Sequence, residues 1–106
     1  MLVTDAISPY GLQDGEYKWD QRLLLSENGS CRLLNGTLVG STVPLLNACK
    51  NLAEWSKEAS PAIWSATIAP RIVLGDYDYF IGKSLNQLLR WRMGEADNQL
   101  SWQRAD

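Results

Sequence analysis

The stretch Asn35-Gly36-Thr37-Leu38-Val39-Gly40-Ser41 decides how the rest of this sequence is interpreted. Two glycines bracket three residues directly before a run with helical periodicity, and glycine lets a backbone turn sharply and a ligand approach it closely. Ser41 and Thr42 can each accept a hydrogen bond from the free N–H groups at a helix start. Such a turn offers backbone donors to a polar or anionic ligand. On this pattern alone, a loop and helix cap without a ligand is the simpler interpretation.

The residues that follow predict two helices. Apolar side chains recur at helical spacing from Leu45 to Trp55, with Cys49 among them, and this helix is expected to end near Ser56. Ser60-Pro61 predicts the start of the second helix, since proline is favoured at the first helical position. Pro70 predicts a kink or break, followed by a last turn that Gly75 closes. The inner face of the second helix is expected to carry Ile63, Ala66 and Thr67.

The residues before the stretch predict short strands. Leu2–Asp5 is expected to be a short buried strand that ends on an acid, and residues 16–19, 22–26 and 31–34 are further strands. Asn28-Gly29 is a strong hairpin signal, because both central residues of a type I′ turn need positive φ. In the strand from residue 22 to 26, Leu23 and Leu25 are expected on one face and Leu24 on the other.

The last third of the sequence predicts a second hairpin. Residues 88–93 and 99–103 are expected to be strands joined by a turn at Gly94–Asn98, after a polar aromatic loop at Asp76–Tyr79 and a turn at Ile81–Lys83. The five tryptophans are scattered over helices and strands. They therefore indicate packing rather than a platform for carbohydrate stacking.

Composition limits the classes of protein that this sequence can represent. With 106 residues, 45% of them hydrophobic, the chain is long enough for one small domain with a modest core. A formal charge of −2 argues against nucleic acid or an anionic membrane as a partner. No apolar run approaches the roughly 20 residues of a membrane span, and no signal peptide is evident. The expected location is the cytoplasm.

The sequence contains no histidine and only two cysteines, Cys31 and Cys49. Catalysis by Ser-His-Asp or Cys-His within this chain is thereby excluded, and the commonest zinc ligand is missing. Two cysteines form no disulfide framework. Because Cys49 falls on the apolar face of a predicted helix, it is expected to be a buried free thiol.

Several motifs occur along the chain in a specific order and spacing. They are Leu2–Ala6 (LVTDA), Gly11–Tyr17 (GLQDGEY), Asn35–Ser41 (NGTLVGS), Asn51-Leu52, Ala66–Arg71 (ATIAPR) and Ile81–Lys83 (IGK). Together they resemble the C-terminal part of the N-acetylglucosamine-6-phosphate deacetylase family, within the amidohydrolase superfamily. The similarity extends over nearly the whole chain.

This resemblance implies an α/β fold, a (β/α)8 barrel with a small β-sandwich, and a chemistry. Residues 1–75 would form the last barrel strand, a β-hairpin insertion and two helices, and residues 76–106 the C-terminal hairpin of the sandwich. Asp5 matches the catalytic aspartate that takes a proton from the attacking water and returns it to the leaving amine. Leu38, Val39 and Gly40 match a loop that binds substrate mainly through its backbone. The family implies a divalent metal such as zinc and an amino-sugar phosphate as substrate.

The chain also departs from the family. A barrel of this type needs about 250 residues, and the family's metal ligands lie upstream of the segment that matches Leu2–Asp5. The expectation is a C-terminal fragment, without a cofactor of its own, that is inactive alone and adopts an α+β fold. A truncated gene, a split-gene product and an engineered piece remain open. Expected partners are further copies of this chain or a missing upstream barrel fragment. The alternative is a non-catalytic structural or interaction remnant that assembles through exposed strand edges.

Overall fold

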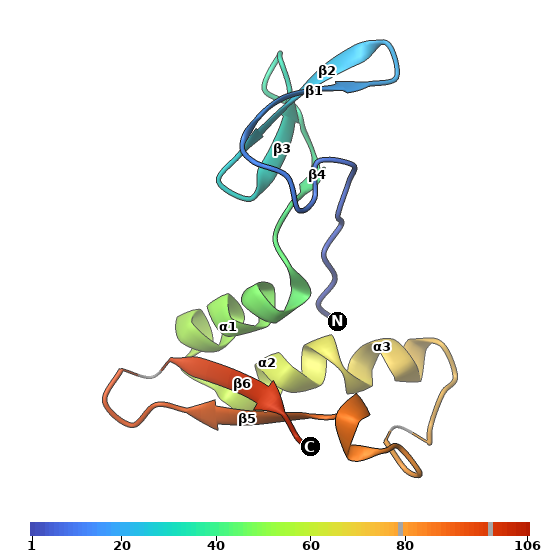
Figure 1. Cartoon of the computed structure of the whole chain (residues 1–106), viewed down its shortest axis with the longest axis vertical. Helices are drawn as coiled ribbons and strands as arrows, with labels where there is room; N and C mark the ends of the chain where they lie inside the picture. Colours follow the sequence, from blue (N-terminus) through green and yellow to red (C-terminus); the bar gives the residue numbers. More distant parts are fainter. Residues whose placement is uncertain (79, 98) are drawn as a thin grey trace. The chain divides into compact units, whose positions relative to one another are not determined.

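The computed structural model describes residues 1–78, 80–97 and 99–106, and these divide into two compact units (Figure 1). One unit is Val3–Leu45; the other combines Met1–Leu2 with Leu46–Asp106. Both contain an antiparallel sheet, and the helices belong to the second, so the described chain is α+β, as expected. The predicted division at residue 75 concerns the domains of the related enzymes and stays a prediction.

The first unit is a four-stranded antiparallel sheet whose strands follow one another in sequence order. Each strand pairs with the next, as expected for hairpins with short turns. The strands are β1 (Gly15–Trp19), β2 (Arg22–Glu27), β3 (Ser30–Leu33) and β4 (Leu38–Ser41).

The turn between β2 and β3 confirms the hairpin predicted at Asn28-Gly29. Asn28 has φ of 51° and Gly29 has φ of 81°, the two positive values that a type I′ turn requires. The Gly29 carbonyl also accepts a hydrogen bond of 3.0 Å from the N–H of Thr42. A Cβ at residue 29 would lie 2.6 Å from a methyl of Val43, so glycine is also required for space.

The two faces of β2 differ as the sequence predicts. Leu24 is 0% exposed and Ser26 is 1% exposed, and the register pairs Ser26 with Cys31, which is also buried. Leu23 and Leu25 lie on the opposite face and are exposed. The inner face therefore carries the core of this unit.

Two sequence predictions in this unit are wrong. Leu2–Asp5 is not a buried strand: its residues belong to none of the described strands, and Asp5 is exposed. The isolated parallel bridge to Ser41 is made by the residue that follows, Ala6. The stretch at residues 35–41 does not lead directly into a helix, since its second half is β4. Edge pairing with β3 overrides the turn propensity of its glycines.

The second unit contains three helices, one 3₁₀ turn and a two-stranded sheet. Its core consists of Cys49, Ala53, Ala62 and Leu100, with partly buried apolar side chains around them. The elements are α1 (Leu45–Ser56), α2 (Ala59–Ala66), α3 (Ile68–Val73), η1 (Leu85–Gln87), β5 (Leu89–Met93) and β6 (Leu100–Arg104). Each described helix is too short or too polar to cross a membrane.

The break in the second predicted helix falls earlier than expected. Thr67 separates α2 from α3, and Pro70 is the third residue of α3, where a missing N–H breaks no helical hydrogen bond. Gly75, with φ of 76°, closes α3: its N–H donates to Ile72 O at 3.0 Å and that of Asp76 to Arg71 O at 2.9 Å. This pair of bonds is a Schellman ending, so the predicted glycine stop is confirmed.

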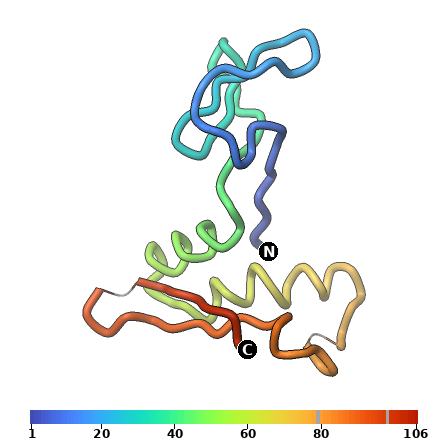
Figure 2. Tube along the Cα trace, viewed as in Figure 1, coloured from blue at the N-terminus to red at the C-terminus, as the bar shows by residue number. Residues whose placement is uncertain are grey.

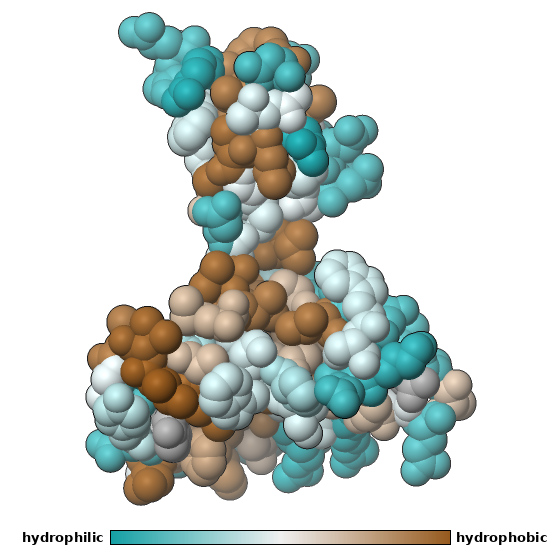
Figure 3. Space-filling view, turned by 180° about the vertical axis from the view of Figure 1, so that it is seen from behind, coloured by the Kyte–Doolittle hydropathy of each residue, from teal (hydrophilic) through white to brown (hydrophobic). Residues whose placement is uncertain are grey.

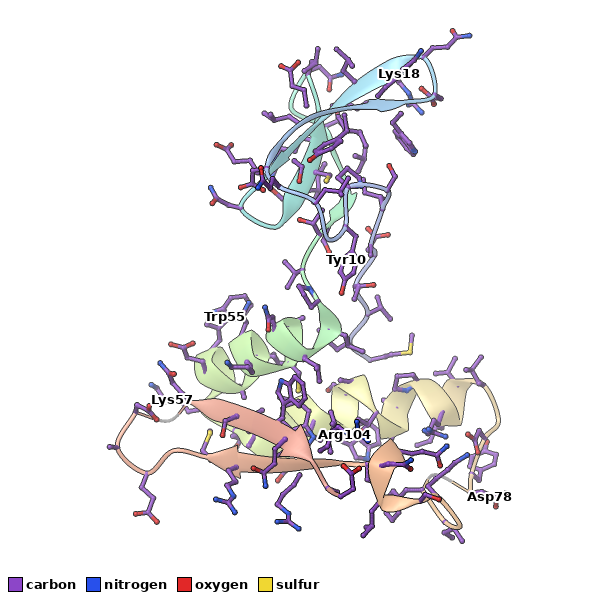
Figure 4. The ribbon with its side chains drawn as sticks, viewed as in Figure 1. Tyr10, Lys18, Trp55, Lys57, Asp78 and Arg104 are labelled. Atoms are coloured by element: carbon purple, nitrogen blue, oxygen red, sulfur yellow. The ribbon has the colours of Figure 1, made fainter. Side chains whose placement is uncertain are left out.

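The apolar face of α1 is narrower than its spacing predicts. Cys49 and Ala53 are buried, whereas Trp55 is 77% exposed (Figure 4). Thr67 is exposed too, and Ala62 takes the buried position on α2. The predicted hairpin and the Ile81–Lys83 turn are present as β5, β6 and a turn with Gly82 at φ of 75°. The parts of those predictions that concern Tyr79 and Asn98 lie outside the described residues.

Candidate functional site

The segment that carries Asp5 lies directly beside β4. The N–H of Ser41 donates to the carbonyl of Asp5 at 2.9 Å, and the N–H of Ile7 donates to the carbonyl of Ser41 at 3.3 Å. These bonds form the parallel bridge between Ala6 and Ser41. Figure 2 shows the N-terminal segment passing the green trace of β4. Two motifs that are 35 residues apart in the sequence therefore meet within one unit.

Ser41 holds this pairing with its side chain as well. Its hydroxyl donates to the carbonyl of Thr4 at 2.5 Å and accepts a bond of 3.4 Å from the N–H of Val43. The sequence predicts a helix cap at Ser41, but α1 begins only at Leu45. Its observed role is to connect β4 to the N-terminal segment.

Gly40 is buried against the backbone of that segment. A Cβ placed on Gly40 would lie 2.8 Å from the carbonyl oxygen of Asp5 and 2.8 Å from a methyl carbon of Ile7. The residue has no positive φ in this structure, so the requirement for glycine is one of space. A larger residue would push β4 away from Asp5.

Asp5 adopts an uncommon backbone conformation. Its φ is 50°, in the left-handed region that aspartate and asparagine enter more readily than most residues. The residue is exposed, and in the described part of the chain its carboxylate takes part in none of the ion pairs. The carboxylate is therefore available to a ligand or to water.

Leu38 and Val39 precede Gly40 on an irregular part of β4. The register pairs Cys31 with Gly40 but Arg32 with Leu38, so Val39 is an extra residue at a β-bulge. Bulges redirect side chains and backbone groups and are frequent beside active sites. Leu38 is 58% exposed and Val39 is partly buried. The four residues expected at the site thus lie on two adjacent segments of one unit.

This arrangement has defined chemical capacity. An exposed carboxylate can accept a proton from water and return it to a leaving group. Backbone N–H and C=O groups of an irregular strand can orient a polar ligand. The described residues thus bring together one carboxylate that can exchange a proton, that of Asp5, and one backbone segment that can bind a ligand, Leu38–Gly40.

The described residues do not make up a divalent-metal site. The sequence has no histidine, and nowhere in residues 1–78, 80–97 and 99–106 do three Cys, Asp or Glu side chains gather as ligands would. Asp5 is a single carboxylate, whereas a zinc site needs three or four ligands. The metal that the resemblance implies therefore does not fit the residues of this chain alone.

Sequence reasoning missed the part that Thr4 and Ser41 play. Their contact depends on a pairing across 37 positions. No local signal predicts it, because both residues are ordinary in turns and caps. No local pattern predicts β4 either, because Leu38-Val39-Gly40-Ser41 does not alternate apolar and polar residues.

Comparison with known proteins supports one family. A curated N-acetylglucosamine-6-phosphate deacetylase from Vibrio furnissii is 32% identical over 75 residues, which are 70% of this chain and 19% of that protein. The crystal structure of N-acetylglucosamine-6-phosphate deacetylase from Thermotoga maritima matches with a TM-score of 0.63 at 31% identity, over 73% of this chain and 22% of that one. No family model matches.

The chain spans about a fifth of the length of the relatives that it matches. The sequence match and the structural match nevertheless point to the same family of proteins. In both respects, the chain is related to the C-terminal part of N-acetylglucosamine-6-phosphate deacetylases.

Proposed function

We propose that this chain supplies Asp5 and the segment Leu38–Gly40 to the active site of an N-acetylglucosamine-6-phosphate deacetylase, which forms glucosamine 6-phosphate and acetate. The observation that carries the proposal is the contact between the two motifs. Gly40 lies so close to the Asp5 carbonyl that a Cβ would stand 2.8 Å from it. A catalytic acid and a substrate-binding segment have to be neighbours, and the closeness of Asp5 to Gly40 supports these proposed roles.

In this proposal, Asp5 is the acid–base group. Its carboxylate accepts a proton from the water that attacks the acetyl carbonyl and then donates that proton to the amine nitrogen as the C–N bond breaks. Both transfers need a carboxylate that a ligand can reach, and Asp5 is exposed. The positive φ of Asp5 and the backbone contacts of its segment to Ser41 support a defined orientation.

Leu38, Val39 and Gly40 bind the sugar through their backbone. The support for this role is the bulge at Val39, which takes backbone groups out of the regular ladder. The buried position of Gly40 fixes this segment relative to Asp5. Selectivity for the sugar would then depend on main-chain geometry more than on side-chain identity.

The remaining parts of the site are proposed to come from residues that this chain does not contain. The related proteins are about five times longer than the matched region. In the proposed assembly, residues 1–75 include the last unit of a (β/α)8 barrel, residues 76–106 belong to a small sandwich, and the metal ligands lie on the barrel. The proposed location is the cytoplasm.

A chimera tests the proposal. The matched region of the Vibrio furnissii deacetylase is replaced with this chain, and acetate release from N-acetylglucosamine 6-phosphate is measured. Activity is expected, and Asp5→Asn should remove most of it. Asp78→Asn is the control, because Asp78 is an exposed carboxylate in a loop of the other unit (Figure 4). A folded chimera without turnover would contradict the proposal.

The second candidate is a non-catalytic structural or interaction role. Exposed apolar side chains favour it, among them Val73, Leu74, Phe80 and Ile81, which are 59–83% exposed. Exposed apolar surface commonly marks contact with another protein surface. If the chimera is inactive but the chain binds the barrel part of a relative tightly, this second function is the correct one.

A further inference from the structure

Strand β2 carries leucine on both of its faces. Leu24 is fully buried on the inner face, while Leu23 and Leu25 are 42% and 38% exposed on the opposite, outer face. A strand of an antiparallel sheet with one face in water ordinarily alternates apolar and polar residues, and apolar residues on both sides indicate that both faces are covered. Figure 3 shows apolar surface over this unit.

Two charged side chains of opposite sign flank Leu25 on the outer face. The register places Glu16 of β1 and Arg32 of β3 directly opposite Leu25, one on each side. Each strand lies about 4.8 Å from the next, so the two charges are about 10 Å apart with the leucine between them. Both are exposed. A row across the outer face is thus acidic, apolar and basic in turn.

This row is complementary to itself. When one outer face is laid on a second copy by a two-fold rotation about an axis parallel to β2, Leu25 meets Leu25 and Leu23 meets Leu23. The same rotation exchanges the two sides of the sheet. Glu16 of each copy then faces Arg32 of the other. A rotation about an axis across the strands would instead oppose like charges.

We propose that the outer face of the β1–β4 sheet, formed by Glu16, Leu23, Leu25 and Arg32, is a docking surface for a second copy of this chain. The dimer is a face-to-face sheet packing with a two-fold axis parallel to β2. An isologous contact of this kind is the commonest closed symmetry among soluble oligomers. It differs from association through strand edges, because no strand hydrogen bonds are exchanged.

The size of the face makes this a weak dimer. Four strands of about five residues span about 15 by 17 Å, well below the roughly 800 Å² per partner of a standard stable interface. A dissociation constant on the order of 100 µM is expected. Leu38, which the register places opposite Arg32, is 58% exposed and would shield the charge pair from water.

Glu27, also on the outer face, opposes the contact. It follows Leu25 by two positions at the end of β2, where the rotation brings it close to Glu27 of the other copy. Two carboxylates at the rim repel each other. Glu27→Gln should therefore strengthen the dimer about twofold to fivefold, while a monomer or an edge-paired dimer would not respond.

The first test is the mass of the 106-residue chain in sedimentation experiments between about 10 µM and about 1 mM. A monomer–dimer equilibrium is expected, and Leu25→Glu should weaken it at least tenfold. Leu74→Glu is the matched control, because Leu74 is 83% exposed in the other unit. A monomer over the whole range, or a dimer that only Leu74→Glu disrupts, would overturn the proposal.

The second test uses charge reversal. Glu16→Arg and Arg32→Glu should each be monomeric, since each homodimer then holds two like-charge pairs. Mixed in equal amounts, the two variants should form a heterodimer, because position 16 of either chain then faces an unlike charge at position 32 of the other. Circular dichroism of each variant checks folding. If folded variants associate as the unchanged chain does, or fail to recover on mixing, the two-fold contact proposed here is wrong.

Discussion

The carbonyl oxygen of Asp5 occupies the space that a side chain on Gly40 would need: a Cβ there would lie 2.8 Å from it. The N–H of the next residue, Ser41, donates to the same oxygen at 2.9 Å. This pair joins the proposed catalytic residue to the proposed substrate-binding segment. Its consequences can be measured in the chain itself and in a chimera.

Gly40→Ala should destabilise the first unit. The new Cβ meets the Asp5 carbonyl and an Ile7 methyl at distances that real contacts do not show, so β4 or the N-terminal segment has to move. Overpacking of this kind typically costs about 1–3 kcal/mol. Urea unfolding followed by circular dichroism measures the change. Gly11→Ala is the control: residue 11 has φ of 82° and open space around it, so only about 1 kcal/mol of backbone strain is expected.

Ser26→Ala should stabilise the same unit. The Ser26 hydroxyl is buried and has no hydrogen-bond partner among the described residues. An unsatisfied buried polar group costs about 1–3 kcal/mol, and alanine removes it while leaving a small space. A gain of about 1 kcal/mol in the free energy of unfolding is expected. Ser101→Ala, at an exposed position of β6, should stay within about 0.5 kcal/mol of the unchanged chain; equal effects at both positions would contradict this account of Ser26.

The pair of Asp20 and Arg22 should be visible in an acid titration. The Arg22 side chain hydrogen-bonds the Asp20 carboxylate, at 2.6 Å from Nη2, and lowers the pKa of Asp20 from 3.8 to about 2. A lowered folded-state pKa means that the stabilising contribution is complete above the unfolded pKa and is lost as the pH falls through about 2. NMR of the carboxyl carbon should give a midpoint near 2, and Arg22→Gln should return it toward 3.8.

The thiol of Cys49 should be inert at neutral pH. Burial raises the pKa of Cys49 above its ordinary value of 9.0, and the thiolate is the reactive form. A thiol reagent at about pH 7.5 should label Cys49 only when the chain is unfolded by urea. Cys49→Ser should lower the free energy of unfolding by about 1–3 kcal/mol, since it buries a hydroxyl in an apolar core. Rapid labelling of the folded chain would contradict the buried position.

The 106-residue chain by itself should not deacetylate the sugar phosphate or retain zinc. One carboxylate and a backbone segment do not complete a metal-assisted hydrolase, and no histidine is present. Acetate release and the zinc content after dialysis measure this directly. Turnover above a buffer blank, or one equivalent of zinc retained, would show that the chain contains a site of its own.

Much of the local structure could be predicted from single residues with strong backbone preferences. Asn28-Gly29 predicts its hairpin because few residues accept positive φ at both central positions, and Gly75 predicts the end of α3 for the same reason. The exposure of Trp55 could not be predicted, because helical spacing indicates a face but not its width. The strand β4 could not be predicted from the sequence either, because its strand character depends on pairing with β3.

The candidate site was predictable only by resemblance. Motifs that match the deacetylase family identify Asp5 and Gly40 as candidates, and the contact between these residues depends on a pairing that no local pattern encodes. The expected strand at Leu2–Asp5 is not formed in this structure. Strands in the middle of a parallel sheet need neighbours on both sides, and among the described residues this part of the chain has one isolated bridge, at Ala6.

The rate of the chimera with Asp5→Asn tests the central claim most directly. Asparagine has nearly the shape of aspartate and also tolerates the positive φ of 50° at residue 5, so the backbone contact to Ser41 should persist. The amide cannot accept and return a proton. If Asp5 is the acid–base group, kcat should fall by about 10²–10⁴ with the circular dichroism spectrum unchanged. Full activity of the folded Asp5→Asn chimera, equal to that of Asp78→Asn, would contradict the assignment.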